Sequence, residues 1–199
     1  QGNFFYSSEN SGDSEYPVYV RSNDFKGTNK TTLLDVNKLA SAHDYFAVSG
    51  LNTSPNEQVL AYGQDTVSRR IYTIVFKDLT TGKMLDDKLK GTSGGTVWGN
   101  DNKTIYYIKK DLQTLLGFQV YRHTLGQPQS NDKLVYEEKD KSYYTYIYKS
   151  KDGSTIYIGH DSTEASGVSL IDANDSTSMP KRVLERKHRH EYSIAKLGN

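Results

Sequence analysis

The 199-residue sequence has no cysteine, only four prolines and no apolar run approaching the ~18 residues of a membrane-spanning helix. Without cysteine, disulfides and thiolate zinc sites are excluded, and a reducing compartment is permitted. Neither sign of charge is in excess, because the sequence has 25 Lys and Arg and 24 Asp and Glu, for a net charge of +1. Binders of nucleic acids or membrane surfaces carry a basic excess, so neither partner is predicted.

The first six residues, Gln-Gly-Asn-Phe-Phe-Tyr, carry no signal-peptide pattern. We therefore expect a cytoplasmic protein, with a periplasmic location left open. The sequence also starts without Met, inside a segment typical of a strand. From this we expect it to begin within a longer protein.

Aromatic residues and glycine are what the sequence has in quantity. It contains 16 Tyr, 6 Phe, 1 Trp and 16 Gly, although its mean hydropathy is only −0.73. Tyr and Phe suit half-buried strands, where one ring face packs and a polar edge meets water. Many glycines and few prolines indicate tight turns. A folded, β-rich protein is predicted.

An internal repeat organises the chain. Residues 54–62, 100–107 and 151–158 are each a polar turn followed by a β-branched and aromatic run. Taking Asn56, Asn102 and Asp152 as equivalent, the repeats lie 46 and 50 residues apart. Each unit also has a first strand before the turn, and a third and an outer strand after it. The first strands are 45–51, 96–99 and 143–148, and the outer strands are 84–89, 133–137 and 182–184.

Four antiparallel strands repeating at this interval predict a β-propeller, whose repeats run ~40–50 residues. The predicted fold is all-β, a partial β-propeller of about four blades of four-stranded antiparallel sheets in one domain, 1–199. Its blades are 44–91, 92–141 and 142–190, after a blade remnant at 1–43 and before a first strand of the next blade at 191–199. The ragged ends fit a closed four-bladed ring or the cut edges of a larger one, and periodicity leaves both open.

Ser93 lies in Gly91-Thr92-Ser93-Gly94-Gly95, which matches the G-x-S-x-G pattern of a hydrolase nucleophile elbow. An elbow needs a buried apolar strand before the serine and a helix after it. Here residues 86–90 are polar, and two glycines oppose a helix start. We interpret the motif as an inter-blade loop and predict no catalytic residue in this chain.

His188 and His190 flank Arg189 and precede Glu191, and two imidazoles at i, i+2 in a strand share one face. Neighbouring Lys and Arg residues would repel a cation, and no third ligand is near in sequence. An exposed basic strand and loop is the favoured interpretation, so no metal and no cofactor are predicted.

Arg69 and Arg70 begin a predicted strand and project to opposite faces of it. One guanidinium could bind a carboxylate at the propeller surface in bidentate fashion. A solvated loop edge is the alternative, and the residues alone favour it.

Long motifs distributed along the chain resemble the oligopeptidase B (protease II) group of the prolyl oligopeptidase family of serine peptidases. The resemblance runs from about residue 4 to 195. Its motifs are LLDVNKLA (33–40), HDYF (43–46), DTVSRR (65–70), FKDL (76–79), VWGNDNKT (97–104), KDLQTLL (110–116), QVYRH (119–123), LVYEEKD (134–140) and HEYS (190–193).

The resemblance implies the first blades of a seven-bladed propeller that covers an α/β-hydrolase catalytic domain. The catalytic triad and the acidic residues that select Arg or Lys would lie in that domain, outside this chain. The propeller of the family admits short peptides, so short basic peptides are the implied substrates. Asp44, Arg69 and Arg70 match positions expected at the interdomain face, with Arg70 the strongest candidate for a gating salt bridge.

Two functions follow as hypotheses. The first is a non-catalytic, substrate-gating propeller segment, inactive alone, whose partner is the catalytic domain of the parent chain. The second is a stand-alone small propeller that serves as a binding scaffold for a protein or ligand. In either case, open blade edges favour self-association.

Overall fold

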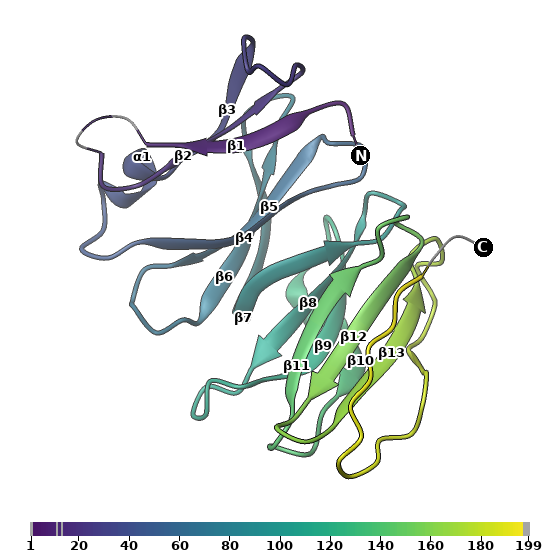
Figure 1. Cartoon of the computed structure of the whole chain (residues 1–199). Helices are drawn as coiled ribbons and strands as arrows, with labels where there is room; N and C mark the ends of the chain where they lie inside the picture. Colours follow the sequence, from purple (N-terminus) through teal and green to yellow (C-terminus); the bar gives the residue numbers. More distant parts are fainter. Residues whose placement is uncertain (1, 11, 13, 197–199) are drawn as a thin grey trace.

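The computed structural model describes residues 2–10, 12 and 14–196. Three antiparallel sheets follow one another along an arc (Figure 1), and the all-β fold predicted from the sequence is confirmed. The first sheet has the order β1-β2-β3, formed by Phe5–Glu9, Val18–Ser22 and Lys30–Asp35. A short helix, α1 (Val36–Ala40), follows β3. Among the described residues, no helix is long and apolar enough to cross a bilayer.

The second sheet joins two blades through one strand. Its order is β10-β9-β8-β7-β6-β5-β4. The central β7 pairs with β6 through its first part and with β8 through its last part. It is thus the outer strand of one blade and the inner strand of the next. The strands are β4 (Ala47–Thr53), β5 (Val59–Asp65), β6 (Tyr72–Asp78), β7 (Met84–Trp98), β8 (Thr104–Lys110), β9 (Gly117–Thr124) and β10 (Lys133–Glu137), with a 3₁₀ turn, η1 (Gln129–Asn131), before β10.

Glycines explain why β7 passes from blade to blade without a separate loop. Gly94 has a left-handed φ of 93°, and a Cβ placed on Gly63 would lie 2.5 Å from the Cα of Gly94. Gly50 meets the carbonyl of Gly94 from β4. The backbones of β4, β5 and β7 therefore touch directly, which only residues without a Cβ allow. The predicted inter-blade loop at 91–95 is instead a bulged part of a continuous strand.

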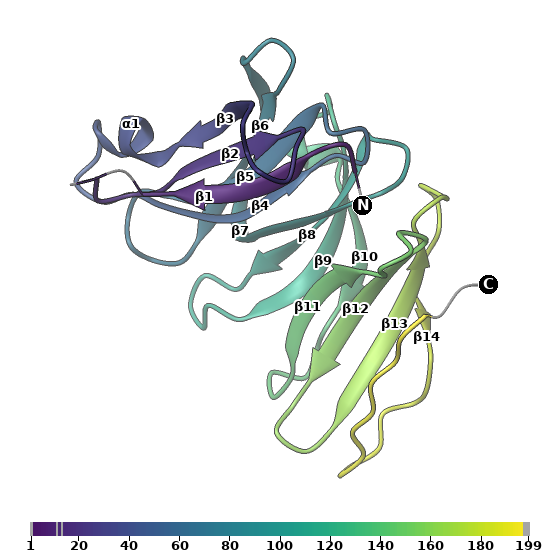
Figure 2. The same cartoon turned by 45° about the horizontal axis from the view of Figure 1, so that its top comes forward.

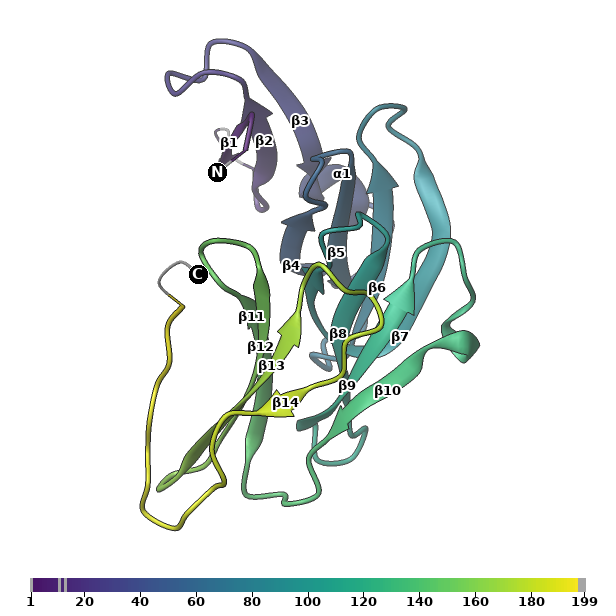
Figure 3. The same cartoon turned by 90° about the vertical axis from the view of Figure 1, so that its right-hand side faces the viewer.

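The third sheet has the order β11-β12-β13-β14, and Figure 3 shows it beside β8–β10. Its strands are Tyr144–Lys149, Thr155–Asp161, Ser166–Asp172 and Lys181–Arg182. Residues 191–196 form no strand, contrary to the strand predicted at 191–199, and residues 197–199 lie outside the described part. The physical reason is that the backbone of Tyr192 bonds a side chain and not the backbone of a neighbouring strand. Its amide donates to the Ser166 hydroxyl at 2.7 Å.

Three apolar clusters hold neighbouring blades together, as stacked blades require. The first lies between the β1–β3 sheet with α1 and β4–β6, which Figure 2 shows layered together, and it includes Leu34, Phe46 and Tyr62. A second, around Phe76 and Trp98, joins the two blades that share β7. The third packs β8–β10 against β12 and β13.

Strand direction sorts the connections into two faces. Ala47 pairs with Asp65, so the connection before β4 and the one after β5 lie at the same end of their strands. Tyr144 pairs with Asp161 in the same way in the third sheet. We call this end the Arg70 face and define it by the connections 36–46, 66–71, 111–116, 138–143, 162–165 and 183–190.

Candidate functional site

The 66–71 connection is built around the buried carboxylate of Asp65, which is 1% exposed. One oxygen accepts the amide of Val67 at 2.9 Å and the other accepts the amide of Arg70 at 2.7 Å. Ser68 and Arg70 have left-handed φ angles of 56° and 53°, which residues with a Cβ adopt at a cost. The two hydrogen bonds offset this cost, so the backbone that carries Arg70 is fixed.

Lys110, the last residue of β8, supports the same connection from the next blade. Its ammonium donates to the Arg70 carbonyl at 2.9 Å. Burial, and then the charge of Arg70, lower the pKa of Lys110 below its ordinary value. Burial raises the pKa of Tyr72, and the charges of Tyr45 and Asp65 raise it further.

Arg69 and Arg70 present their side chains to solvent. Within the part of the chain that the structure describes, neither guanidinium has a hydrogen bond or ion pair. Arg70 and Lys110 place positive charge near the buried carboxylate of Asp65. A planar guanidinium on a fixed backbone is suited to bidentate recognition of a carboxylate.

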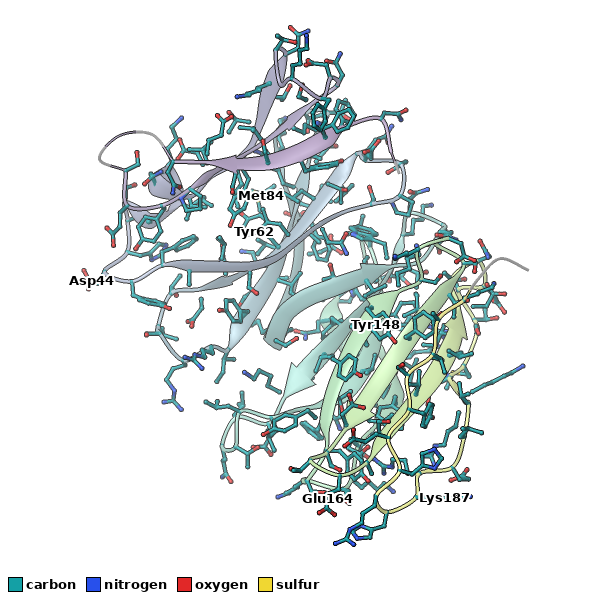
Figure 4. The ribbon with its side chains drawn as sticks, viewed as in Figure 1. Asp44, Tyr62, Met84, Tyr148, Glu164 and Lys187 are labelled. Atoms are coloured by element: carbon teal, nitrogen blue, oxygen red, sulfur yellow. The ribbon has the colours of Figure 1, made fainter. Side chains whose placement is uncertain are left out.

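Asp44 lies on the same face, in the exposed connection between α1 and β4, at the left edge of Figure 4. The structure therefore brings the connections of Asp44, Arg69 and Arg70 to one end of the sheets. It does not pair these side chains with one another among the described residues. Their predicted role as gating residues stays a prediction.

A partly buried ion pair on this face was not found by sequence reasoning. Arg186 donates to both carboxylate oxygens of Glu138, at 2.7 and 3.2 Å, and its guanidinium lies 3.8 Å from the ring centre of Tyr143. Tyr136 and the amide of Asp140 also donate to Glu138. Burial raises the pKa of Glu138, but Arg186 and these donors outweigh it, so the net shift is downward. The pair ties two successive blade-to-blade connections together.

Beside this pair, a pocket of about 340 Å³ opens between the 111–118 and 137–143 segments. Its walls combine Leu116, Phe118 and Tyr143 with charged residues of both signs, including Asp111 and Lys141. It adds a recessed, partly apolar feature to the Arg70 face.

Ser93 sits within β7, and the strand continues to Trp98 rather than turning into a helix. The strand-to-helix turn of a nucleophile elbow is therefore not present at Ser93. The neighbouring Thr92 donates to the Tyr72 carbonyl and accepts the amide of Gly94, which shapes the bulge.

His188 and His190 are exposed in the 183–190 connection. His188 and Arg189 approach Glu164 at 3.6 and 3.9 Å, and Figure 4 shows Glu164 and Lys187 at the same lower edge of the molecule. Across residues 2–10, 12 and 14–196, no three His, Asp or Glu side chains gather as a metal site would require. These distances describe a loosely paired basic loop.

Comparison with known proteins gives one consistent family. The family described as "Prolyl oligopeptidase, N-terminal beta-propeller domain" matches residues 1–199. Dipeptidyl aminopeptidase BI of Pseudoxanthomonas mexicana is 40% identical over 167 residues, covering 76% of this chain and 23% of that protein. Protease 2 of Moraxella lacunata is 30% identical over 200 residues, covering 97% of this chain and 29% of that protein.

A solved structure agrees with the sequence relatives. Oligopeptidase B from Leishmania major superposes with a TM-score of 0.93 at 28% identity, covering 99% of this chain and 28% of that chain. The chain thus spans less than a third of the length of each of these proteins.

Proposed function

Because this chain belongs to the prolyl oligopeptidase family and matches its N-terminal β-propeller domain throughout, we propose that it is the non-catalytic, substrate-gating part of an oligopeptidase B-like serine peptidase. The Arg70 face is the side that meets the catalytic α/β-hydrolase domain of the parent chain. The parent enzyme cleaves short peptides after Arg or Lys.

The observation that carries this proposal is the Arg70 guanidinium, which has no hydrogen bond or ion pair within the described residues, on a backbone fixed by Asp65. The two positive φ angles in this loop lower the stability of the fold. Backbone strain of this kind is concentrated at functional sites, where it holds a side chain in position. An acidic group of the catalytic domain supplies the missing partner when the two domains close. A charged pair that forms only in the closed state favours that state and so controls access.

The test is made in the full-length peptidase that contains this chain. Arg70→Gln removes the charge, and Lys151→Gln, an exposed lysine at the opposite end of the strands, is the matched control. We expect Arg70→Gln to lower kcat/KM for a short Arg-containing peptide several-fold. It should also admit a peptide several times longer that the unmodified enzyme excludes. Equal behaviour of both variants in both assays would refute gating by Arg70.

Substrate class is tested separately, because it does not depend on the gate. Matched short peptides with Arg, Lys, Gln or Leu before the scissile bond should be cleaved only when that residue is basic. The similarity to dipeptidyl aminopeptidase BI favours a second candidate, release of dipeptides from a free N-terminus. Blocking the substrate's α-amino group abolishes that second activity and spares internal cleavage.

Residues 1–199 alone should not hydrolyse these peptides. Hydrolysis that disappears in Ser93→Ala would overturn the assignment of a non-catalytic role. The rival function, a stand-alone propeller used as a scaffold, is separated by reading the encoding frame beyond Asn199. A stop codon there favours the scaffold, and a continuing frame with an elbow motif favours the peptidase.

A further inference from the structure

Two histidines are fully buried at joints between blades, away from the residues of the proposed gate. His123 in β9 and His160 in β12 are each 0% exposed. We call the contact of β7 with β9 and the β9–β10 connection the first joint. The contact of β10 with β12 is the second joint.

At the first joint, His123 lies between two carboxylates from different blades. Its Nδ1 is 2.6 Å from Asp132, which precedes β10, and its Nε2 is 3.0 Å from Asp87 of β7. The two carboxylates are 2% and 7% exposed. A ring with an acceptor at each nitrogen satisfies both contacts only as the doubly protonated imidazolium.

The other groups that face His123 support the charged ring. Tyr107 of β8 donates to Asp132 at 2.8 Å, and the amide of Gly126 donates to Asp87 at 2.6 Å, so both carboxylates are held in place. Phe76 of β6 stacks on the ring. Burial opposes the charge, but the two carboxylates outweigh it and raise the pKa of His123 above its ordinary value.

At the second joint, His160 is in the opposite situation. Its ring stacks on Tyr136 of β10 with centres 5.4 Å apart, and Gly167 of β13, its cross-strand partner, lies so close that an added Cβ would overlap the ring Cε1. Neither ring nitrogen has a hydrogen-bond partner within the described residues, and nor does the hydroxyl of Thr145, its cross-strand neighbour. This environment holds the ring neutral.

The charged groups around His160 make its protonation unfavourable. Arg186 and Arg182 from the C-terminal segment oppose a further positive charge, while Glu138 and Asp161 favour it, and Glu138 is already committed to Arg186. Burial and then Arg186 lower the pKa of His160 below its ordinary value.

We propose that these two histidines make the joints respond to protons in opposite directions, so that alkaline pH loosens the first joint and acidic pH loosens the second. The His123 contribution is complete below the unfolded pKa of ~6.5 and is lost as pH rises through the higher folded pKa. The His160 contribution is complete above ~6.5 and is lost as pH falls toward the lower folded pKa. The blades are held most firmly at about pH 6.5, where both contributions are close to complete.

Loosening of the second joint at acidic pH also affects the Arg70 face. Tyr136 stacks on His160 and also donates to Glu138, the anchor of Arg186. Opening this joint therefore frees the 183–190 connection. Glu138 itself responds only below its ordinary value of 4.5, so the two effects separate along the pH axis.

The first experiment measures each ring in the unmodified 199-residue chain by C2–H deuterium exchange of histidine and mass spectrometry. The same rings in denaturant are the reference. His123 should titrate above its denatured value and His160 below it. If either ring titrates as it does in denaturant, the proposal is overturned for that joint, whatever the variants do.

The second experiment follows amide exchange of peptides from each joint between pH 5 and 9, corrected for intrinsic rates. A difference of one bound proton between the closed and open states, gained at His123 and lost at His160, changes the opening equilibrium by up to about tenfold per pH unit. His123→Gln should abolish the alkaline response, His160→Leu should abolish the acidic response between pH 6.5 and 5, and the exposed control His43→Gln should change neither. Retention of either slope in its variant would contradict the assignment.

Discussion

The carboxylate of Asp65 accepts the backbone amide of Arg70 at 2.7 Å, while the Arg70 side chain itself remains unpaired among the described residues. The buried Asp65 thus fixes the backbone of Arg70 and forms no ion pair with its side chain. A loop backbone fixed in this way loses little further entropy when a partner binds the side chain it carries, which is the advantage of a preorganised contact.

Asp65→Ala should lower the free energy of unfolding by about 1–3 kcal/mol, because two amides lose their buried acceptor. Asp65→Asn keeps one acceptor oxygen and should cost less. Urea unfolding of the three proteins measures this. In the full-length peptidase, Asp65→Ala should also reproduce the kinetic effect of Arg70→Gln, although the Arg70 charge is intact. Unchanged stability with unchanged kinetics would show that the loop does not need Asp65.

Local sequence patterns predicted the strands and turns that are determined by residues adjacent in the chain. The outer strand at Lys133–Glu137 has the predicted bounds, and the three polar turns each connect paired strands. Alternating aromatic and β-branched residues and turn chemistry determine such elements. The strand shared by two blades was missed, because its continuity depends on Gly50 and Gly63 meeting Gly94 from distant segments.

The buried charged contacts were also missed, because each joins residues that are far apart in the sequence. Glu138 and Arg186 are 48 residues apart, and Asp87 lies 36 residues from His123. Nothing in their local sequence distinguishes them from exposed residues. Arg69 and Arg70 were singled out because two adjacent arginines at a predicted strand start are conspicuous, and because the family resemblance includes them; the structure starts β6 only at Tyr72, so the predicted strand start was wrong and both arginines belong to the connection before it. The Asp65 bonds that fix Arg70 required the structure.

Substitutions at Gly63, Gly94 and Gly95 test the close approach of strands. Gly94→Ala forces a Cβ onto a residue with φ of 93°, 2.9 Å from the Tyr72 ring, and Gly63→Ala meets the Gly94 backbone. Each should lower stability by about 1–3 kcal/mol. Gly95→Ala is the matched control, since no atom lies within 4 Å of its added Cβ, and it should change stability by less than about 0.5 kcal/mol. Thermal and urea unfolding compare the three, and equal effects would contradict the close approach.

Glu138 and Arg186 should be energetically coupled. A double-mutant cycle with Glu138→Gln and Arg186→Gln should give about 1–3 kcal/mol, because the side chains are only 4% and 20% exposed. The control cycle, Arg182 with Glu185, is an exposed pair in the same segment and should give less than about 1 kcal/mol. Since the pKa of Glu138 is lowered, its contribution is complete above 4.5 and is lost as pH falls through the folded pKa. A coupling that stays constant from pH 7 to pH 3 would contradict an ionic pair.

The isolated 199-residue chain should self-associate through the face of its last sheet. Tyr144, Tyr146 and Tyr148 of β11 are 65%, 40% and 38% exposed, and Tyr148 stacks on Tyr157. The corresponding faces of the earlier blades pack against the next blade, whereas these three tyrosines of the last described sheet are exposed. Tyr144→Lys should weaken association, because it sets a charge in the interface and removes no side-chain hydrogen bond within the described residues. Light scattering across a concentration series measures the effect, with Lys151→Glu as a surface-charge control. A monodisperse monomer at every concentration would show that the exposed tyrosines do not drive assembly.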